Sequence, residues 1–452
     1  MYDAIEKHRD VPIVVEREFH GSANMTIDLE FDQATVIQDT SRSPEAVFGV
    51  SAHCTSSISI DEGTAVQSQE ISTGADNHVH VPSQAAFEAV TEEEATLFSF
   101  YIKNAGPWLD IVSQMRCFGQ LVPRLALTSP VLYYACLAAA AHVMYLWGRL
   151  SQETYEFYHN KSISILIPLL DPTAAGCTDS LLLTSVILRM SEQFSEIADD
   201  GQYHLHGAFG LFVSASASWS PSRTDAAGVA FWTYVRESLR ICFLNEQACP
   251  FRLGVVDTSD LFEPATDEVW ANRMTYLLAE VCNACWSKEA TSTHITSRNQ
   301  EKLQAVQNDV ERWERSLPPT FRPWYQSQSR TTPFADIRFL STWHTIGWQQ
   351  YYAAKTMLAA YLPIEPEQNL RALHQQARKI LIDNAKMLCA VVFSDDEIGT
   401  GVNGTHLVAW GAQFFEGKLE QDETLRWLKE FMRETSWPNK TCYEKLEKQW
   451  GR

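Results

Sequence analysis

Hydrophobic residues recur at intervals of three and four along most of the chain, from Thr91 to its C-terminal end. This spacing places apolar side chains on one face of an α-helix, whereas a half-buried strand needs strict alternation. Convincing alternating strands are absent, and turn residues separate the periodic segments. The pattern therefore predicts an all-α fold of about a dozen or more helices, in one large helical domain over residues 91–452.

Start and stop residues mark the first expected helices. Thr91 and Glu94 have the spacing of a capping box, and the helix that they open is expected to stop at Gly106-Pro107. The next well-marked helix has Ser129 as its N-cap, Pro130 in its first turn and Gly148 as its terminator. It contains the longest apolar stretch, but His142 and many small residues within it favour a buried helix over a membrane span. We expect no contact with a membrane.

The remaining helices follow from the same reading. Within residues 225–247 we expect one apolar face, formed by Phe231, Tyr234, Val235, Leu239, Cys242 and Phe243. We expect Trp232 and Trp437 to act through stability rather than through activity. The expected helical segments are residues 151–172, 178–199, 201–216, 225–247, 267–288, 300–317, 334–362, 367–393, 405–417, 422–435 and 440–450.

Residues 1–90 differ from the rest of the chain. They are rich in Ser, Thr, Asp and Glu, their apolar residues are isolated, and no period is sustained, so we expect a mostly disordered tail. The stretch MTIDLEFDQATVI mixes acidic and apolar residues as activation segments do, although we favour a solvated tail. The N-terminus lacks the basic and apolar regions of a secretory signal peptide.

Charge and cysteine content narrow the class of protein. The net charge is −20 and no run of four or more Lys or Arg occurs, so direct binding of nucleic acid would need a local basic patch. The ten cysteines are scattered along the chain, which suits reduced thiols in the cytosol or the nucleus.

One glycine motif has the spacing of a dinucleotide fingerprint. Gly399, Gly401 and Gly404 read G-x-G-x-x-G, but a fingerprint needs a strand before it and a βαβ unit around it. A helical pattern and three acidic residues precede these glycines instead. We therefore expect a flexible loop between helices, with Thr405 as the cap of the next helix.

Acidic pairs raise the alternative of a magnesium-dependent terpenoid-type enzyme. Asp395-Asp396 and Asp199-Asp200 could each begin D-D-x-x-D, but the fifth positions hold Gly399 and Tyr203. Asn308-Asp309 opens the second motif of such enzymes, yet the positions that require Ser and Glu are not met. We predict no metal site, no cofactor and no catalytic residue.

Cysteine and histidine pairs give no complete zinc site. Cys282 and Cys285 form C-x-x-C within an expected helix, and Cys242 and Cys249 are also close in sequence, but neither pair has local partners. We interpret both pairs as core thiols. His204 and His206 stand two apart, which on a helix turns their side chains away from each other, so a capping or core role is expected.

Four segments resemble the fungal-specific transcription factor domain, the all-α regulatory region that usually follows a binuclear zinc cluster. Together, in this order, the four segments span roughly residues 91–450. The residues that carry the resemblance are SPVLYYACLAAAAHVM, the region LLTSVILRMSEQFSEIADDGQYHLHGAFGLF, the segment AFWTYVRESLRICFLNEQACPF, and the C-terminal stretch with Trp437-Pro438 and a closing Leu-x-x-x-Trp.

The resemblance implies a nuclear transcription regulator that works through partners. The family's zinc cluster uses six spaced cysteines, whereas residues 1–90 contain only Cys54. We therefore expect DNA to be reached either indirectly or through an N-terminal zinc cluster that is missing from this sequence. Expected partners are other transcription factors or co-regulators, with a homodimer or heterodimer as one form. The alternatives are a helical scaffold or dominant-negative dimerisation partner and, with less support, the terpenoid-type enzyme.

Overall fold

The structure is a computed structural model of the chain. It describes residues 90–170, 178–194, 202–214, 218–250, 252–287, 297–362 and 370–452. Apart from Val90, the tail expected at residues 1–90 lies outside the described residues. All the described residues belong to one of the two units into which contacts divide the chain.

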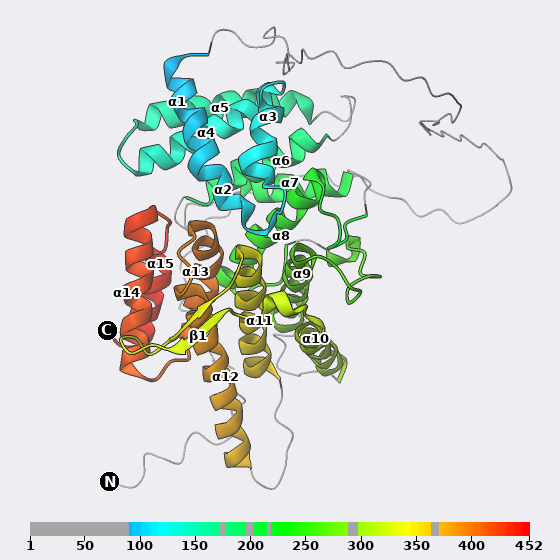
Figure 1. Ribbon diagram of the computed structural model, residues 1–452, viewed down its shortest axis with the longest axis vertical. Coiled ribbons are helices and arrows are strands. Elements are labelled where there is room, and N and C mark those ends of the chain that lie inside the picture. Colours follow the sequence, from blue (N-terminus) through cyan, green and yellow to red (C-terminus); the bar gives the residue numbers. More distant parts are fainter. Residues whose placement is uncertain are drawn as a thin grey trace, which may run out of the picture. The chain divides into compact units, whose positions relative to one another are not determined.

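Helices form most of the described chain, which confirms the all-α prediction (Figure 1). Short 3-10 or π-helical turns join some of them, at η1 (Tyr101–Ala105), η2 (Asp110–Val112), η3 (Cys117–Leu121), η4 (Leu253–Val255) and η5 (Pro319–Phe321). The helices are α1 (Glu92–Phe100), α2 (Gly106–Leu109), α3 (Val122–Ala126), α4 (Pro130–Leu146), α5 (Gln152–Leu169), α6 (Asp179–Glu192), α7 (Tyr203–Ser214), α8 (Ala226–Asn245), α9 (Asp267–Trp286), α10 (Ser297–Ser316), α11 (Thr342–Tyr361), α12 (Leu370–Phe393), α13 (Ile398–Ala412), α14 (Lys418–Thr435) and α15 (Lys440–Gln449).

The residues that begin and end α1 and α4 are partly those that we expected. The Thr91 hydroxyl accepts from the Glu94 amide at 3.1 Å, and the Glu94 carboxylate accepts from the Thr91 amide at 3.0 Å, which completes the capping box. Gly148 has a φ of +69° just after α4, so it ends the helix in the left-handed region. Ser129 precedes α4, but its side chain makes no capping hydrogen bond. No helix among the described residues, α4 included, is long and apolar enough to cross a membrane.

The first helix does not stop at Gly106-Pro107, where we expected its end. The π-helical turn η1 carries the chain from α1 directly into α2, and Pro107 lies in the first turn of α2. A Cβ at position 106 would lie 2.8 Å from the carbonyl oxygen of Phe118. Gly106 thus serves a close backbone approach rather than a helix end.

A β-hairpin interrupts the helical series, in a part of the chain where the sequence shows no convincing alternation. Strands β1 (Tyr325–Gln328) and β2 (Ala335–Arg338) pair antiparallel, with Tyr325 opposite Arg338. The helix expected at 334–362 therefore begins only at Thr342. Four-residue strands are too short for a sustained alternation, and only Ile337 of the two strands is buried. The Ile337 amide donates to the Ser394 hydroxyl at 2.9 Å, which ties the hairpin to the end of α12.

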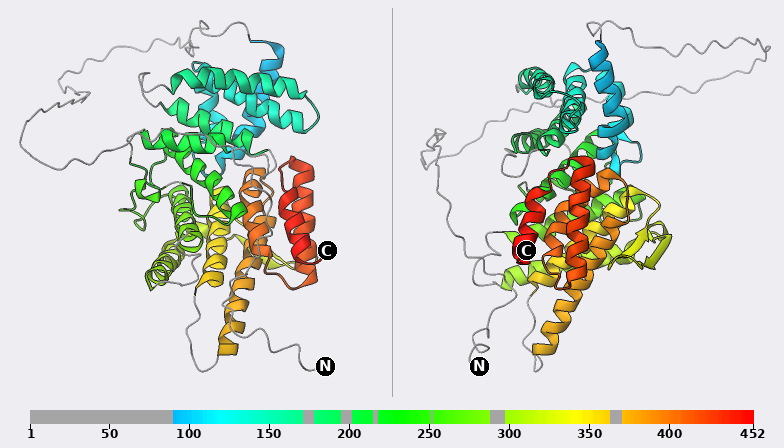
Figure 2. Two further views of the ribbon diagram at one scale, coloured as in Figure 1. Left: turned by 180° about the vertical axis from the view of Figure 1, so that it is seen from behind. Right: turned by 90° about the vertical axis from the view of Figure 1, so that its left-hand side faces the viewer.

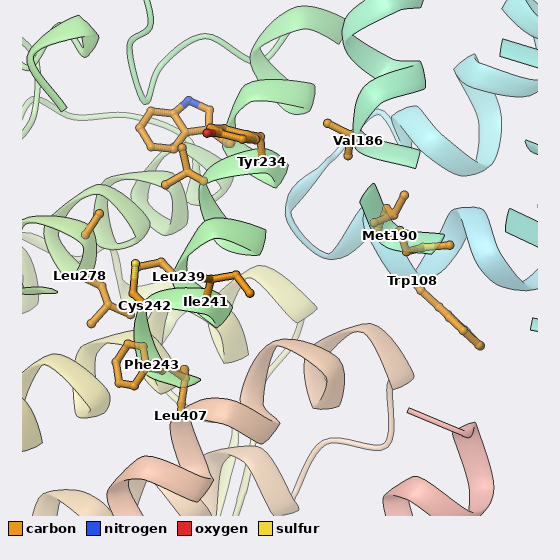
Figure 3. Close-up of a cluster of buried hydrophobic side chains, with 14 of the residues drawn as sticks. Trp108, Val186, Met190, Tyr234, Leu239, Ile241, Cys242, Phe243, Leu278 and Leu407 are labelled. Carbon is orange, nitrogen blue, oxygen red and sulfur yellow. The ribbon is translucent and has the colours of Figure 1, made fainter. Parts of the chain in front are cut away.

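Helix α8 is buried on every side. All residues from Ala226 to Phe243 are buried, because α6, α7, α9 and α13 surround the helix (Figure 2). Leu239 and Ile241 leave the helix on different sides and both end in apolar surroundings (Figure 3). The six residues of the expected apolar face are in the core. The opposite face is buried as well, which the periodicity alone did not predict.

The glycines of G-x-G-x-x-G lie within α13, not in a loop. The helix begins at Ile398 with Glu397 as its N-cap, so Thr405 is a buried mid-helix residue and does not cap it. A Cβ at Gly399 would lie 2.5 Å from the carbonyl oxygen of Trp108. A Cβ at Gly401 would clash with the ring of Phe431, and one at Gly404 would lie 2.6 Å from Val392. Glycine is needed at these positions because α13 approaches its neighbours closely; close packing, not turn formation, explains the motif.

Gly399→Ala is expected to destabilise the protein by about 1–3 kcal/mol, because the new Cβ meets a backbone oxygen that cannot rotate away. Gly210→Ala in α7 is the matched control. No atom lies within 4 Å of a Cβ built there, so the better helix propensity of Ala should add up to about 1 kcal/mol. Urea unfolding of both variants measures the difference. Equal stability of the two variants would contradict the close-approach explanation.

Trp232→Ala is expected to lower the free energy of unfolding by about 3–5 kcal/mol. The side chain is 1% exposed, and its indole N–H donates to the carbonyl oxygen of Ser220 at 3.0 Å. Trp324→Ala provides the control, since Trp324 is 62% exposed and should cost less than about 1 kcal/mol. Chemical unfolding checks both values. A loss of activity at unchanged stability in the Trp232 variant would contradict a role in stability.

Candidate functional site

The acidic pair that suggested a magnesium site has a structural role. Asp395 accepts from the Thr345 hydroxyl at 2.6 Å and from the Glu397 amide at 2.9 Å, so it ties α11 to the start of α13. Asp199-Asp200 lies outside the described residues, and Asn308-Asp309 lies on α10. No group of three or more His, Cys, Asp or Glu side chains in the described part of the chain is arranged to hold a metal ion.

The cysteine pairs lie in the core as expected. Cys282 and Cys285 are buried in α9, and burial raises the pKa of the Cys282 thiol to about 11. Cys242 is buried at the end of α8, and its sulfur lies 3.6 Å from that of the half-buried Cys249. Raised pKa values keep such thiols protonated and weakly nucleophilic.

The two histidines of H-x-H do not converge. His204 is half-buried, and its ring meets that of His159 edge-on at 5.7 Å. Burial lowers the pKa of His204 to about 4, so this ring is neutral near pH 7. His206 is exposed. The pair has the divergent geometry expected for residues two apart on a helix.

A cavity between helices is the strongest candidate site, and the sequence reading did not identify it. It provides about 30 Å³ in which the centre of a water molecule can lie, and it lies where η2, α2, α6, α8 and α13 meet the turn before α15. The lining residues are Trp108, Leu109, Ile111, Met190, Gln193, Thr233, Arg236, Glu237, Arg240, Val402, Asn403, His406 and Trp437.

The polar side of the cavity comes mainly from the R-E-S-L-R segment of α8. Arg236 is 2% exposed and donates to the Asn272 side-chain oxygen at 3.0 Å and to the Thr233 hydroxyl at 3.2 Å. Burial lowers the pKa of Arg236 to about 10, so the guanidinium remains charged near pH 7. The guanidinium of Arg240 lies over the ring of Trp437, 5.0 Å from its centre.

Glu237 is the one carboxylate in the lining. Its side chain is 8% exposed, and neither oxygen has a partner at hydrogen-bonding geometry within the described residues. Burial raises the pKa of Glu237 to about 8, although Arg189, Arg236 and the nearby Gln193 amide lower it in part. The carboxyl group is therefore mostly protonated at pH 7 and can donate a hydrogen bond.

His406 and Trp437 close the cavity from the C-terminal part of the chain. Burial lowers the pKa of His406 to about 3, and the charge of Arg240 adds to that effect. Neither His406 Nδ1 nor Trp437 Nε1 has a hydrogen-bond partner in the described structure. Both residues thus bring buried polar atoms that could bind a guest molecule.

The lining also contains apolar side chains. Trp108 of α2 and Met190 of α6 are among them and lie next to each other (Figure 3). Of all the lining residues, only Val402 and Asn403 are half-exposed, which places the mouth of the cavity on α13. A cavity lined by both charged and apolar residues suits a small amphipathic molecule.

Arg236, Glu237 and Arg240 give the lining charged and polar groups that can bind a polar molecule. One signal in the sequence could have indicated this site. Arg236, Glu237 and Arg240 stand in a helix that is otherwise almost wholly apolar, and charges in such a helix must be buried with their partners.

The comparisons with known proteins give one finding. The family model described as "Fungal specific transcription factor domain" matches residues 96–452. Neither the curated proteins nor the solved structures contain a significant match to the chain. The matched span begins within α1 and includes every residue that lines the cavity.

Glu237 should contribute a loss of stability as pH rises from about 5 to 8. The unfolded chain loses this proton near the ordinary pKa of 4.5, whereas the folded chain keeps it up to about 8. Unfolding therefore releases a proton in this window, which contributes a slope of up to about 1.4 kcal/mol per pH unit. Glu237→Gln cannot titrate and should lose this contribution in urea unfolding measured at several pH values.

Glu434→Gln is the control, because Glu434 is exposed and its removal should leave the slope unchanged. Buried histidines affect all three proteins equally, so only the difference between the slopes is compared. Parallel pH profiles for the wild type and Glu237→Gln would show that the carboxyl group is ionised in the folded protein.

Proposed function

Because the chain belongs to the family of the fungal-specific transcription factor domain, we propose that it regulates transcription through this helical domain and its protein partners. The observation that carries the proposal is the family match, which runs from residue 96 to the last residue, 452. The domain would act in the nucleus. It would change which partners it binds by a shift between conformations, without making or breaking covalent bonds.

The charge of the chain supports indirect access to DNA. A net charge of −20 repels DNA phosphate. We propose that a partner protein that binds specific DNA sequences brings this chain to its target. The partner and this chain would form one complex, whether or not they are homologous.

The all-helical domain also favours regulation over catalysis. The aspartates that suggested terpenoid chemistry either tie helices together, as Asp395 does, or lack the rest of their motif. The charged groups that line the cavity between the helices can bind a polar molecule without a covalent step. We therefore propose that the chain is not an enzyme.

A reporter assay tests regulation. The full chain, joined to an unrelated DNA-binding domain, should change reporter transcription at least severalfold in fungal cells relative to that DNA-binding domain alone. Gly399→Ala should reduce the effect by destabilising the domain, whereas the matched Gly210→Ala should retain it. A nuclear, folded fusion with no effect on transcription would contradict the proposal.

A second measurement tests how DNA is reached. The purified full chain should retain no stoichiometric zinc and should shift no specific DNA sequence at physiological salt. Zinc is measured by elemental analysis, and DNA binding by selection from a random-sequence pool. Enrichment of one DNA sequence that the chain binds with nanomolar affinity would contradict the proposal that a partner binds the DNA. It would leave the proposed regulation of transcription unaffected.

A further inference from the structure

Several buried polar atoms without hydrogen-bond partners belong to the residues that line the cavity described above. Among the described residues, such atoms include Arg236 Nε, both carboxyl oxygens of Glu237, His406 Nδ1 and Trp437 Nε1, all on residues of the lining. Unsatisfied buried groups are uncommon in folded proteins, because each loses its hydrogen bonds to water. Their concentration at one place indicates that something other than protein satisfies them.

The shape of the lining distinguishes a ligand from water alone. A bound water molecule needs polar partners on several sides. Here the lining combines polar residues such as Glu237 and His406 with apolar residues such as Trp108 and Met190. A molecule with one polar end and one apolar end can contact both kinds of residue, whereas water forms hydrogen bonds only with the polar ones. The space of about 30 Å³ that is open to the centre of a water molecule limits that molecule to a few non-hydrogen atoms.

The charged residues that line the cavity determine which charge the polar end of the bound molecule should carry. Arg236 and Arg240 each bring a guanidinium, a group that binds carboxylates with paired hydrogen bonds. The one acidic group, Glu237, is mostly protonated at pH 7 and so cancels little of that charge. The site therefore favours an anion at its polar end.

We propose that the cavity binds a short-chain carboxylate, with its carboxylate beside Arg236, Arg240 and Glu237 and its alkyl end between Trp108 and Met190. Entry is past Val402 and Asn403 on α13, the half-exposed members of the lining. Binding would hold α8 and α13 together. That such binding controls transcription rests on the proposed function; the binding itself does not.

The pH dependence of binding follows from the groups around Glu237. These are Arg189 and Glu192 from α6, Arg236 and Arg240 from α8 itself, and His406 from α13. His406 stays neutral above pH 5, and Arg236 stays charged up to about pH 9. Between pH 7 and 9 the change is therefore the ionisation of Glu237, which repels a bound carboxylate.

Propionate is the probe, and propionamide is its neutral control of the same shape. Titrated into the full chain at pH 7, propionate should bind saturably with a Kd of about 0.1–10 mM, measured by tryptophan fluorescence and calorimetry. Sodium chloride at equal ionic strength corrects for general salt effects. Propionamide should bind at least tenfold more weakly, because it carries no charge for the guanidinium groups.

Two variants locate the binding site. In the wild type the affinity for propionate should fall about tenfold between pH 7 and pH 9, as Glu237 loses its proton. Glu237→Gln retains a donor and should bind propionate with little change over this range. Arg240→Gln should weaken binding at least tenfold at pH 7, with circular dichroism to show that it remains folded.

Three results would overturn the proposal. These are no saturable binding of propionate, equal binding of propionate and propionamide, or the same fall with pH in Glu237→Gln as in the wild type. Each of these results is obtained without a reporter. A protein that regulates the reporter but binds no propionate would refute the ligand and leave the proposed function standing.

Discussion

The complete burial of α8 is the constraint on which the rest of the structure depends. A helix surrounded on every side must be covered by several neighbours, and here α6, α7, α9 and α13 supply that cover. The same helix carries three charged residues that cannot reach bulk water. Their partners must then come from the surrounding helices, as Asn272 of α9 does for Arg236. The core and the candidate site thus have one cause, because the cavity lies beside the charged residues of this buried helix.

Much of the helical framework could be predicted because its signals are local. The capping box at Thr91 and the left-handed Gly148 act within one turn of helix, so neighbouring residues are sufficient to identify them. The hairpin at β1 and β2 was missed because four residues are too few to establish a period of two. The π-helical turn before Gly106 was missed because the reason for that glycine is the backbone of Phe118, a tertiary contact.

The candidate site shows the same limit more strongly. Arg236 and His406 are 170 residues apart along the chain, and no local sequence pattern links them. The sequence shows only that α8 carries charges in apolar surroundings. Which side chains those charges meet, and that Glu237 meets no hydrogen-bond partner among the described residues, depends on how α6, α8 and α13 pack. The family resemblance indicated the fold and the class of function, but not this cavity.

The glycines of α13 have a consequence for how specificity could change. Gly401 and Gly404 flank Val402 and Asn403, the two residues at the mouth of the cavity. The absence of side chains at the glycines sets how near α13 lies to Phe431 of α14 and Val392 of α12. A larger residue at either glycine would displace the backbone that carries the mouth while every lining side chain stays the same. Ligand preference in related chains could therefore diverge through helix spacing, at positions that an inspection of the lining residues would overlook.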